Sequence, residues 1–230
     1  MQDDDKKRGT ALLEVLGRQD GDDAVALRFI AEGVPAFALD DALAFAVDKG
    51  SMAVTQALLA AGADAGYCYP GSGDGLLVQA VLGENASLDI AALLIEKGAD
   101  INAGNTFGNT LLMRAVLLGA GADKMQWILE AGADVNAVNY HGRTALIHAV
   151  TMTAADEGAV VDLLLKAGAQ AAHKDEGQRT AAHYAAEFNK PSLAALLDGA
   201  AVRQAFQEAD ARGAPVRRKI HRRPSGAALK

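Results

Sequence analysis

A glycine-containing motif recurs along the chain at intervals of 34 to 36 residues. Each copy has two apolar residues, a two-residue spacer and Gly-Ala-Asp or Gly-Ala-Gln, with its glycine at position 62, 98, 132 or 168. Twelve residues after the last three glycines stand Thr110, Thr144 and Thr180, each opening an apolar run. Two markers in fixed phase indicate a repeated unit of about 35 residues. So short a unit cannot bury its own apolar face, and neighbouring copies must therefore stack.

The residue types within each unit predict two helices and a loop. A threonine such as Thr144 can accept a hydrogen bond from an amide of the first helical turn, so it marks the start of a first helix. The repeated glycine, for example Gly132, stands where a second helix ends, because a helix C-terminus often needs a left-handed residue. Residues 133–143 between these markers are rich in Asn, Gly and Asp, which predicts a protruding hairpin.

Composition also favours helices. The chain is 50% hydrophobic but only 5% aromatic, and a core of Ala and Leu suits closely packed helices better than a sheet. No run of about 18 apolar residues exists, which excludes a transmembrane helix, and residues 1–8 lack the apolar segment of a signal peptide. The single cysteine, Cys68, cannot form an internal disulfide and fits a reducing compartment. We therefore expect a cytoplasmic protein without membrane association.

Charge divides the chain into an acidic body and a basic end. The formal net charge is −7, yet residues 203–230 carry +6, which leaves −13 for residues 1–202. An acidic body should repel nucleic acid and attract a basic partner. Pro215 and Pro224 prevent one continuous helix in the basic end, which predicts a solvated tail.

The repeated unit resembles the ankyrin repeat, whose signature is a unit of about 33 residues with Thr-Pro-Leu-His-x-Ala opening its first helix. The resemblance is strongest at 98–103, 132–137 and 180–186, although the proline is missing from every copy and the histidine survives only as His183. It implies an all-α fold, an ankyrin-repeat solenoid of stacked helix-turn-helix units with protruding β-hairpin loops. It also implies that the imidazole of His183 bonds to loop backbone.

Weaker copies extend the array to about six units. Thr10–Val15 and Asp41–Ala46 open two units near the N-terminus, and Pro191–Leu197 supplies a last second helix. The expected order is a disordered N-terminus (1–8), units at about 9–38, 39–73, 74–107, 108–142, 143–177 and 178–200, a C-terminal capping helix (201–212) and a basic flexible tail (213–230).

Catalytic and metal-binding patterns are not found in the sequence. The five histidines show no metal-ligand spacing, and there is no Cys-x-x-Cys. Nothing near Cys68 predicts a lowered thiol pKa. The glycine-rich segment 71–75 lacks the strand and the Lys-Ser/Thr of a phosphate loop. We therefore expect no enzyme activity, no catalytic residue, no metal and no cofactor.

In the ankyrin fold, the exposed positions of the first helices and the hairpin tips share one concave face where partners usually dock. Tyrosine and arginine are also frequent in binding hot spots. Some hairpin aromatics could instead fold back on neighbouring hairpins. The predicted partner-binding residues are Phe45, Tyr67, Tyr69, Gln79, Phe107, Arg114, Tyr140, His141, His148 and Tyr184.

The sequence thus predicts a non-enzymatic protein–protein interaction module, monomeric alone, that binds a macromolecular partner as a regulator or immunity-type inhibitor. Two alternatives stay open. The basic segment 217–223 could attach the chain to nucleic acid or a membrane, or the chain could be a secreted, host-directed effector. A small-molecule enzyme would need a deep pocket with paired carboxylates or a metal.

Overall fold

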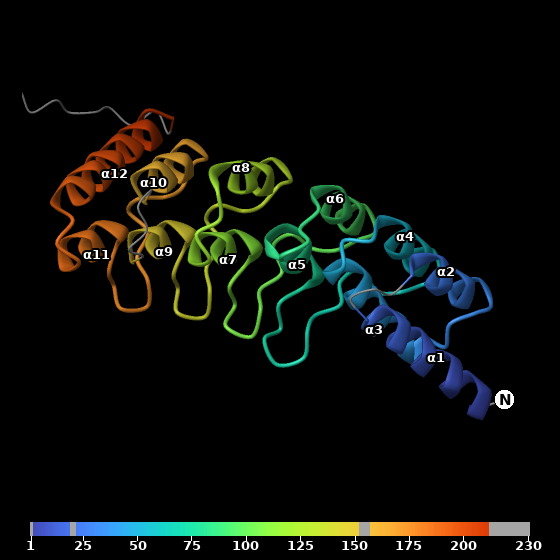
Figure 1. Ribbon diagram of the computed structural model, residues 1–230. Coiled ribbons are helices and arrows are strands. Elements are labelled where there is room, and N and C mark those ends of the chain that lie inside the picture. The colour runs from blue at the N-terminus through green and yellow to red at the C-terminus, as the bar shows by residue number, and fades with distance from the viewer. Residues whose placement is uncertain (1, 19–21, 152–156, 212–230) are drawn as a thin grey trace, which may run out of the picture.

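The computed structural model describes residues 2–18, 22–151 and 157–211, and in these ranges the chain forms twelve helices that follow one another in six pairs (Figure 1). The all-α fold predicted from the sequence is confirmed. The helices are α1 (Gln2–Leu16), α2 (Asp23–Ala31), α3 (Ala36–Asp48), α4 (Met52–Ala60), α5 (Leu76–Leu82), α6 (Leu88–Glu96), α7 (Leu111–Leu117), α8 (Ala122–Glu130), α9 (Ala145–Thr151), α10 (Glu157–Lys166), α11 (Ala181–Glu187) and α12 (Pro191–Ala211).

The helices are arranged in two rows. The first helices of the pairs pack side by side, from α1 against α3 through to α9 against α11, and the second helices form the other row. The loops between pairs project together from the side of the first helices (Figure 1). No helix in the described part of the chain is long and apolar enough to cross a membrane.

The predicted helix ends are confirmed. The hydroxyls of Thr110, Thr144 and Thr180 accept hydrogen bonds from the amides three residues later, at 3.4 to 3.5 Å. Nδ1 of His183 accepts one in return from the Thr180 amide at 3.5 Å, the backbone contact that the resemblance implies. Gly132 follows α8 with a φ of +97°, and the other three repeated glycines have similar values. A side chain is strained there, which explains why glycine recurs at this position.

At one repeated position the first helices contribute small apolar residues to the core, and at another the second helices contribute large ones. The same position of the first helices holds Ala80, Ala115, Ala149 and Ala185, each at most 2% exposed. Alanine lets these backbones approach closely, because no long side chain separates them. The second helices bury Leu58, Leu94, Ile128 and Leu164 completely. The near absence of aromatic residues from the core follows from this close stacking.

Asparagine side chains join successive units at the base of the loops. Oδ1 of Asn102 accepts from the Asp134 amide at 2.8 Å, and its Nδ2 donates to the Gly132 carbonyl at 3.5 Å. One unit later, Asn136 makes the same pair of bonds to the Gln170 amide and the Gly168 carbonyl. Each such asparagine satisfies two backbone groups of the next unit and sets the spacing between loops.

The expectation that residues 1–8 are disordered is wrong from Gln2 onward, because α1 begins there. Gly9 lies inside this helix, where α3 approaches closely. A Cβ atom on Gly9 would come within 2.7 Å of Cζ of Phe37 and 3.1 Å of Cβ of Ala38, so a larger residue would push the exposed Phe37 ring aside. Leu12 and Leu16 are buried in the same core as α3, which holds α1 in place.

The C-terminal end also differs from expectation. The second helix of the last unit and the capping helix predicted at 201–212 form one continuous helix, α12. The stretch around the expected break is mostly Leu, Ala, Arg and Gln, which are good helix formers, and it contains no proline, so the helix continues through it. The Gln204 side chain of α12 caps the last loop, accepting from the Ala171 amide at 3.0 Å and donating to the Ala169 carbonyl at 2.7 Å. The basic tail expected at 213–230 lies outside the described residues.

Replacing Gln204 by alanine should destabilise the fold by about 1 to 3 kcal/mol, because the buried backbone groups of Ala169 and Ala171 lose their partners. Urea unfolding followed by circular dichroism measures the change. Gln207→Ala is the control, because Gln207 is exposed on the same helix. Equal unfolding midpoints for the two variants would contradict this role of Gln204.

Candidate functional site

The tips of neighbouring loops are joined by backbone hydrogen bonds. The Thr106 amide donates to the Ser72 carbonyl at 3.1 Å, and the Tyr140 amide to the Phe107 carbonyl at 3.2 Å. The His141 carbonyl then accepts from the next loop along at 3.2 Å. The described residues contain no β-strand and a single β-bridge, from Cys68 to Gly75, so these hairpins are held mainly by turns. The joined tips form a continuous edge.

A buried polar residue organises the inside of each loop. Oδ1 of Asn105 accepts from the amides of Phe107 and Asn109, at 2.9 and 3.0 Å. Asn139 does the same for the amides of His141 and Arg143. Both asparagines are at most 7% exposed. These bonds fix the loop backbone before any partner arrives.

Two aromatic side chains remain exposed on adjacent tips. Phe107 is 61% exposed and Tyr140 is 70% exposed, and one backbone hydrogen bond joins the two residues. His141 is exposed beside them, and Phe45 is exposed on α3. The exposure that the sequence predicts for these four residues is confirmed. Their contact with a partner stays a prediction.

The tyrosines of the first hairpin instead fold back on α3. The Tyr67 hydroxyl donates to Oδ1 of Asp41 and the Tyr69 hydroxyl to Oδ1 of Asp48, each at 2.7 Å. The hydrogen bond to Asp41 raises the pKa of Tyr67 to about 12, and burial together with Asp48 raises the pKa of Tyr69. Both rings are half-buried. The expectation of freely exposed tips is therefore wrong for these two residues.

The row expected to point outward from the first helices is largely covered by the loops. His148 is 7% exposed and Tyr184 is 3% exposed, so their expected outward exposure is wrong. Gln79 and Arg114 are half-buried, and Arg114 forms an ion pair with Asp74 at 3.1 Å. At three of these positions the side chain holds the loop, because Arg114, His148 and Tyr184 bond to Asp74, Asn139 and Asp175.

Tyr184 centres the largest of these polar clusters. Its hydroxyl donates to Oδ2 of Asp175 at 2.5 Å and accepts from Nη2 of Arg143 at 3.2 Å. The Arg179 guanidinium lies 4.4 Å from the ring centroid, within cation–π distance. Burial raises the pKa of Asp175. The hydrogen bonds from Tyr184 and from the Arg179 amide lower this pKa by more, so it lies below its usual value.

His148 lies buried between α9 and its loop. Nδ2 of Asn139 donates to its Nε2 at 3.2 Å, a bond that needs an unprotonated nitrogen. Burial, together with the positive charges of Arg143 and His141, lowers the pKa of His148 to about 4. His148 is therefore a neutral, structural residue at physiological pH.

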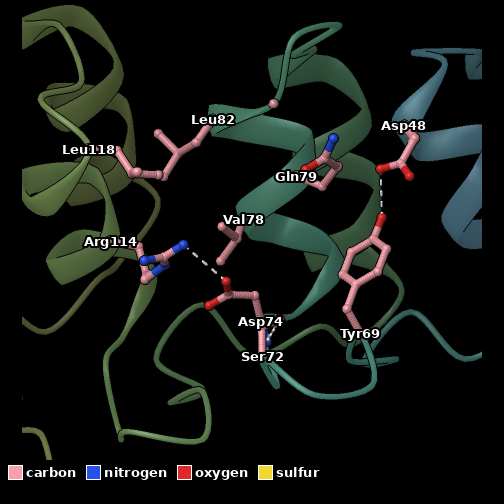
Figure 2. A pocket seen from close by; sticks show the side chains of 10 residues that line it. Asp48, Tyr69, Ser72, Asp74, Val78, Gln79, Leu82, Arg114 and Leu118 are labelled. Atoms are coloured by element: carbon pink, nitrogen blue, oxygen red, sulfur yellow. Dashed lines mark hydrogen bonds and ion pairs between the residues drawn. The ribbon is translucent and has the colours of Figure 1, made fainter.

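A pocket of about 350 Å³ opens on the exposed side of α5 (Figure 2). The end of α3 and the first hairpin contribute Asp48 and Tyr69, and α7 contributes Arg114 on the other side. The sequence analysis predicted Tyr69, Gln79 and Arg114 as partner-binding residues but did not predict that they line one pocket. It did not include Asp48, Leu82 or Leu118. The sequence held one signal for this pocket, because Leu118 is an apolar residue in the turn that follows α7. In the structure its side chain is 56% exposed.

The geometry gives little support for a metal site or for a reactive thiol. The ranges 2–18, 22–151 and 157–211 contain no group of three His, Cys, Asp or Glu side chains that could hold a metal ion. Cys68 is exposed, and its Sγ donates to the Gly66 carbonyl of its own loop at 3.4 Å.

The family model for ankyrin repeats (three copies) matches residues 43–139 and 122–205, which together make up most of the chain. The chain therefore belongs to the ankyrin-repeat family. No curated protein gives a significant match to it.

Acidification should destabilise the protein through His148. The folded state holds this imidazole neutral down to about pH 4, whereas the unfolded state protonates it near pH 6.5. Stability is therefore complete above pH 6.5 and falls as the pH drops from 6.5 toward 4. The expected loss between pH 7 and pH 5 is about 2 kcal/mol, measured by urea unfolding.

His148→Gln should remove most of this pH dependence, since glutamine does not titrate. His141→Gln is the matched control on the exposed part of the same loop and should keep most of it, because the His141 charge is the smallest of the three causes of the His148 shift. An unchanged slope in His148→Gln would show that another group causes the effect.

Proposed function

We propose that this protein is a non-enzymatic binding module that recognises another protein through its hairpin tips and the exposed side of its first helices. Ankyrin repeats are generally protein–protein interaction modules, and the family is typically non-enzymatic. The observation that carries the proposal is the pair Phe107 and Tyr140, two exposed aromatic side chains on adjacent, hydrogen-bonded tips.

The rigidity of the tips supports this function. The chain has only eleven aromatic residues, and two of them lie on loops fixed by Asn105 and Asn139. Exposed aromatic rings on an ordered backbone lose little conformational entropy on binding. Tyrosine and phenylalanine are also enriched at interface cores. The arrangement is typical of a preformed binding surface.

The charge of the chain supports a basic partner. The formal net charge is −7, and the long-range field of an acidic protein accelerates its encounter with a positively charged one. We propose that the protein is a regulator or an immunity-type inhibitor of this partner. In this proposal it acts as a monomer and does not bind nucleic acid. The exposed thiol of Cys68 favours a reducing compartment, and we propose the cytoplasm.

Replacing Phe107 and Tyr140 by serine should weaken capture of the partner at least tenfold, because two exposed aromatic contacts are removed. The measurement compares proteins retained from native lysate by immobilised wild-type and variant chains. Val202→Ser is the control, since Val202 is 55% exposed on α12, away from the tips. Equal retention by both variants would refute binding through the tips.

Association with the captured partner should depend on salt. Raising the ionic strength from about 0.05 M to about 0.5 M should slow association roughly tenfold, because salt screens the attraction between unlike charges. Surface plasmon resonance gives the association rate at each salt concentration. A rate constant independent of salt would exclude steering toward a basic partner.

A further inference from the structure

The pocket on α5 combines an apolar floor with a polar rim. Val78 and Leu82 lie on the exposed side of α5, and Leu118 faces Leu82 from the end of α7 (Figure 2). Leu118 is 56% exposed, so its side chain is left largely without protein contacts. This floor suits the hydrocarbon part of a side chain about as long as lysine or arginine.

The charged groups at the rim are Asp48, Asp74 and Arg114. Asp74 is already neutralised, because Oδ2 accepts from Arg114 at 3.1 Å and Oδ1 from Nδ2 of Asn105 at 2.8 Å. Asp48 uses Oδ1 for the Tyr69 hydroxyl, and within the described residues its Oδ2 has no hydrogen-bond partner. The pocket therefore has an excess of one negative charge, and that charge is on Asp48.

Hydrogen-bonding capacity is also left over at the rim. The side-chain amide of Gln79 makes no hydrogen bond to any described residue, and Figure 2 shows it on the same side of α5 as Asp48. Its oxygen can accept from a cationic group that lies beside Asp48. The Nε of Arg114 is buried without a partner, and its Nη2 is paired with Asp74, so the charge of this guanidinium is already offset at the rim.

We propose that this pocket receives one lysine or arginine side chain of the partner protein, with the hydrocarbon part on Leu82 and Leu118 and the charge on Asp48. The inference rests on the proposed function, and it specifies the chemistry by which that partner is recognised. A basic partner is also the one that the net charge of −7 attracts. A single lysine or arginine side chain would use all three features of the pocket. Its hydrocarbon part would cover the apolar floor, and its charged end would bond to Oδ2 of Asp48 and to the side-chain amide of Gln79.

Capped tripeptides of sequence Gly-Xaa-Gly test the pocket directly. The probes carry Lys, Arg, Glu or Leu at the central position, and nuclear magnetic resonance follows the backbone amides of the full chain. We expect the Lys and Arg probes to shift the signals of Gln79, Leu82 and Leu118 with weak, millimolar affinity. The Glu and Leu probes should leave these signals unchanged.

Asp48→Asn should weaken the Lys and Arg probes about fivefold, because asparagine keeps an acceptor for Tyr69 but removes the charge. Asp198→Asn is the matched control, since Asp198 is an exposed carboxylate on α12. It should change the affinity less than twofold. Binding of Glu or Leu as tight as that of Lys, no shift with any probe, or equal effects of the two substitutions would overturn the inference.

The chain's own basic segment is an alternative occupant. A full-length variant with Arg217, Arg218, Lys219, Arg222 and Arg223 replaced by serine decides between them. If the Lys and Arg probes bind only in this variant, the segment occupies the pocket in the wild type and the inference fails. Equal binding in both chains supports a side chain from another protein.

The test separates this inference from the proposed function. If Phe107 and Tyr140 are needed to retain the captured partner while Asp48→Asn has no effect and no probe binds, the pocket inference fails and binding through the tips stands. If the wild-type chain retains no partner, the proposed function fails, and the tripeptides still show whether the pocket selects a cation.

Discussion

The structure depends on the inability of a single helix pair to bury its apolar surface. Each first helix presents an alanine such as Ala115 or Ala149 to its neighbour, and each second helix inserts a leucine or isoleucine between the two rows. Without the adjacent unit, these side chains would face water. Stacking therefore aligns the units, and their alignment brings the loop tips close enough to form backbone hydrogen bonds. The rigidity of the surface is thus a consequence of the core.

Local rules made much of this fold predictable. Thr110, Thr180 and Gly132 act within their own helix ends, so their roles follow from a few neighbouring residues. The positions of Tyr69 and Tyr184 were not predictable in this way. Tyr69 bonds to Asp48, 21 residues earlier, and Tyr184 bonds to Arg143, 41 residues earlier. Such contacts arise only when units stack, and no pattern within one unit encodes them.

Tyrosine side chains hold the loops at both ends of the surface. In the first hairpin, Tyr67 and Tyr69 donate to carboxylates of α3. On α11, Tyr184 also donates to a carboxylate, that of Asp175, but it accepts from Arg143 and lies beneath the Arg179 guanidinium. All three rings are half-buried or buried, so they position the loops, and the exposed aromatic side chains of the tips are Phe107 and Tyr140.

The last loop of the array is held by side chains on both of its sides. Asn102 and Asn136 occupy the fourth position after a repeated glycine and reach forward to the next unit, but the equivalent position of the last loop holds Ala172. Gln204 takes up the backbone groups of that loop from the opposite direction. Asn136 of the preceding unit and Gln204 of α12 thus bond to neighbouring backbone groups of one loop, so its position is set from both sides.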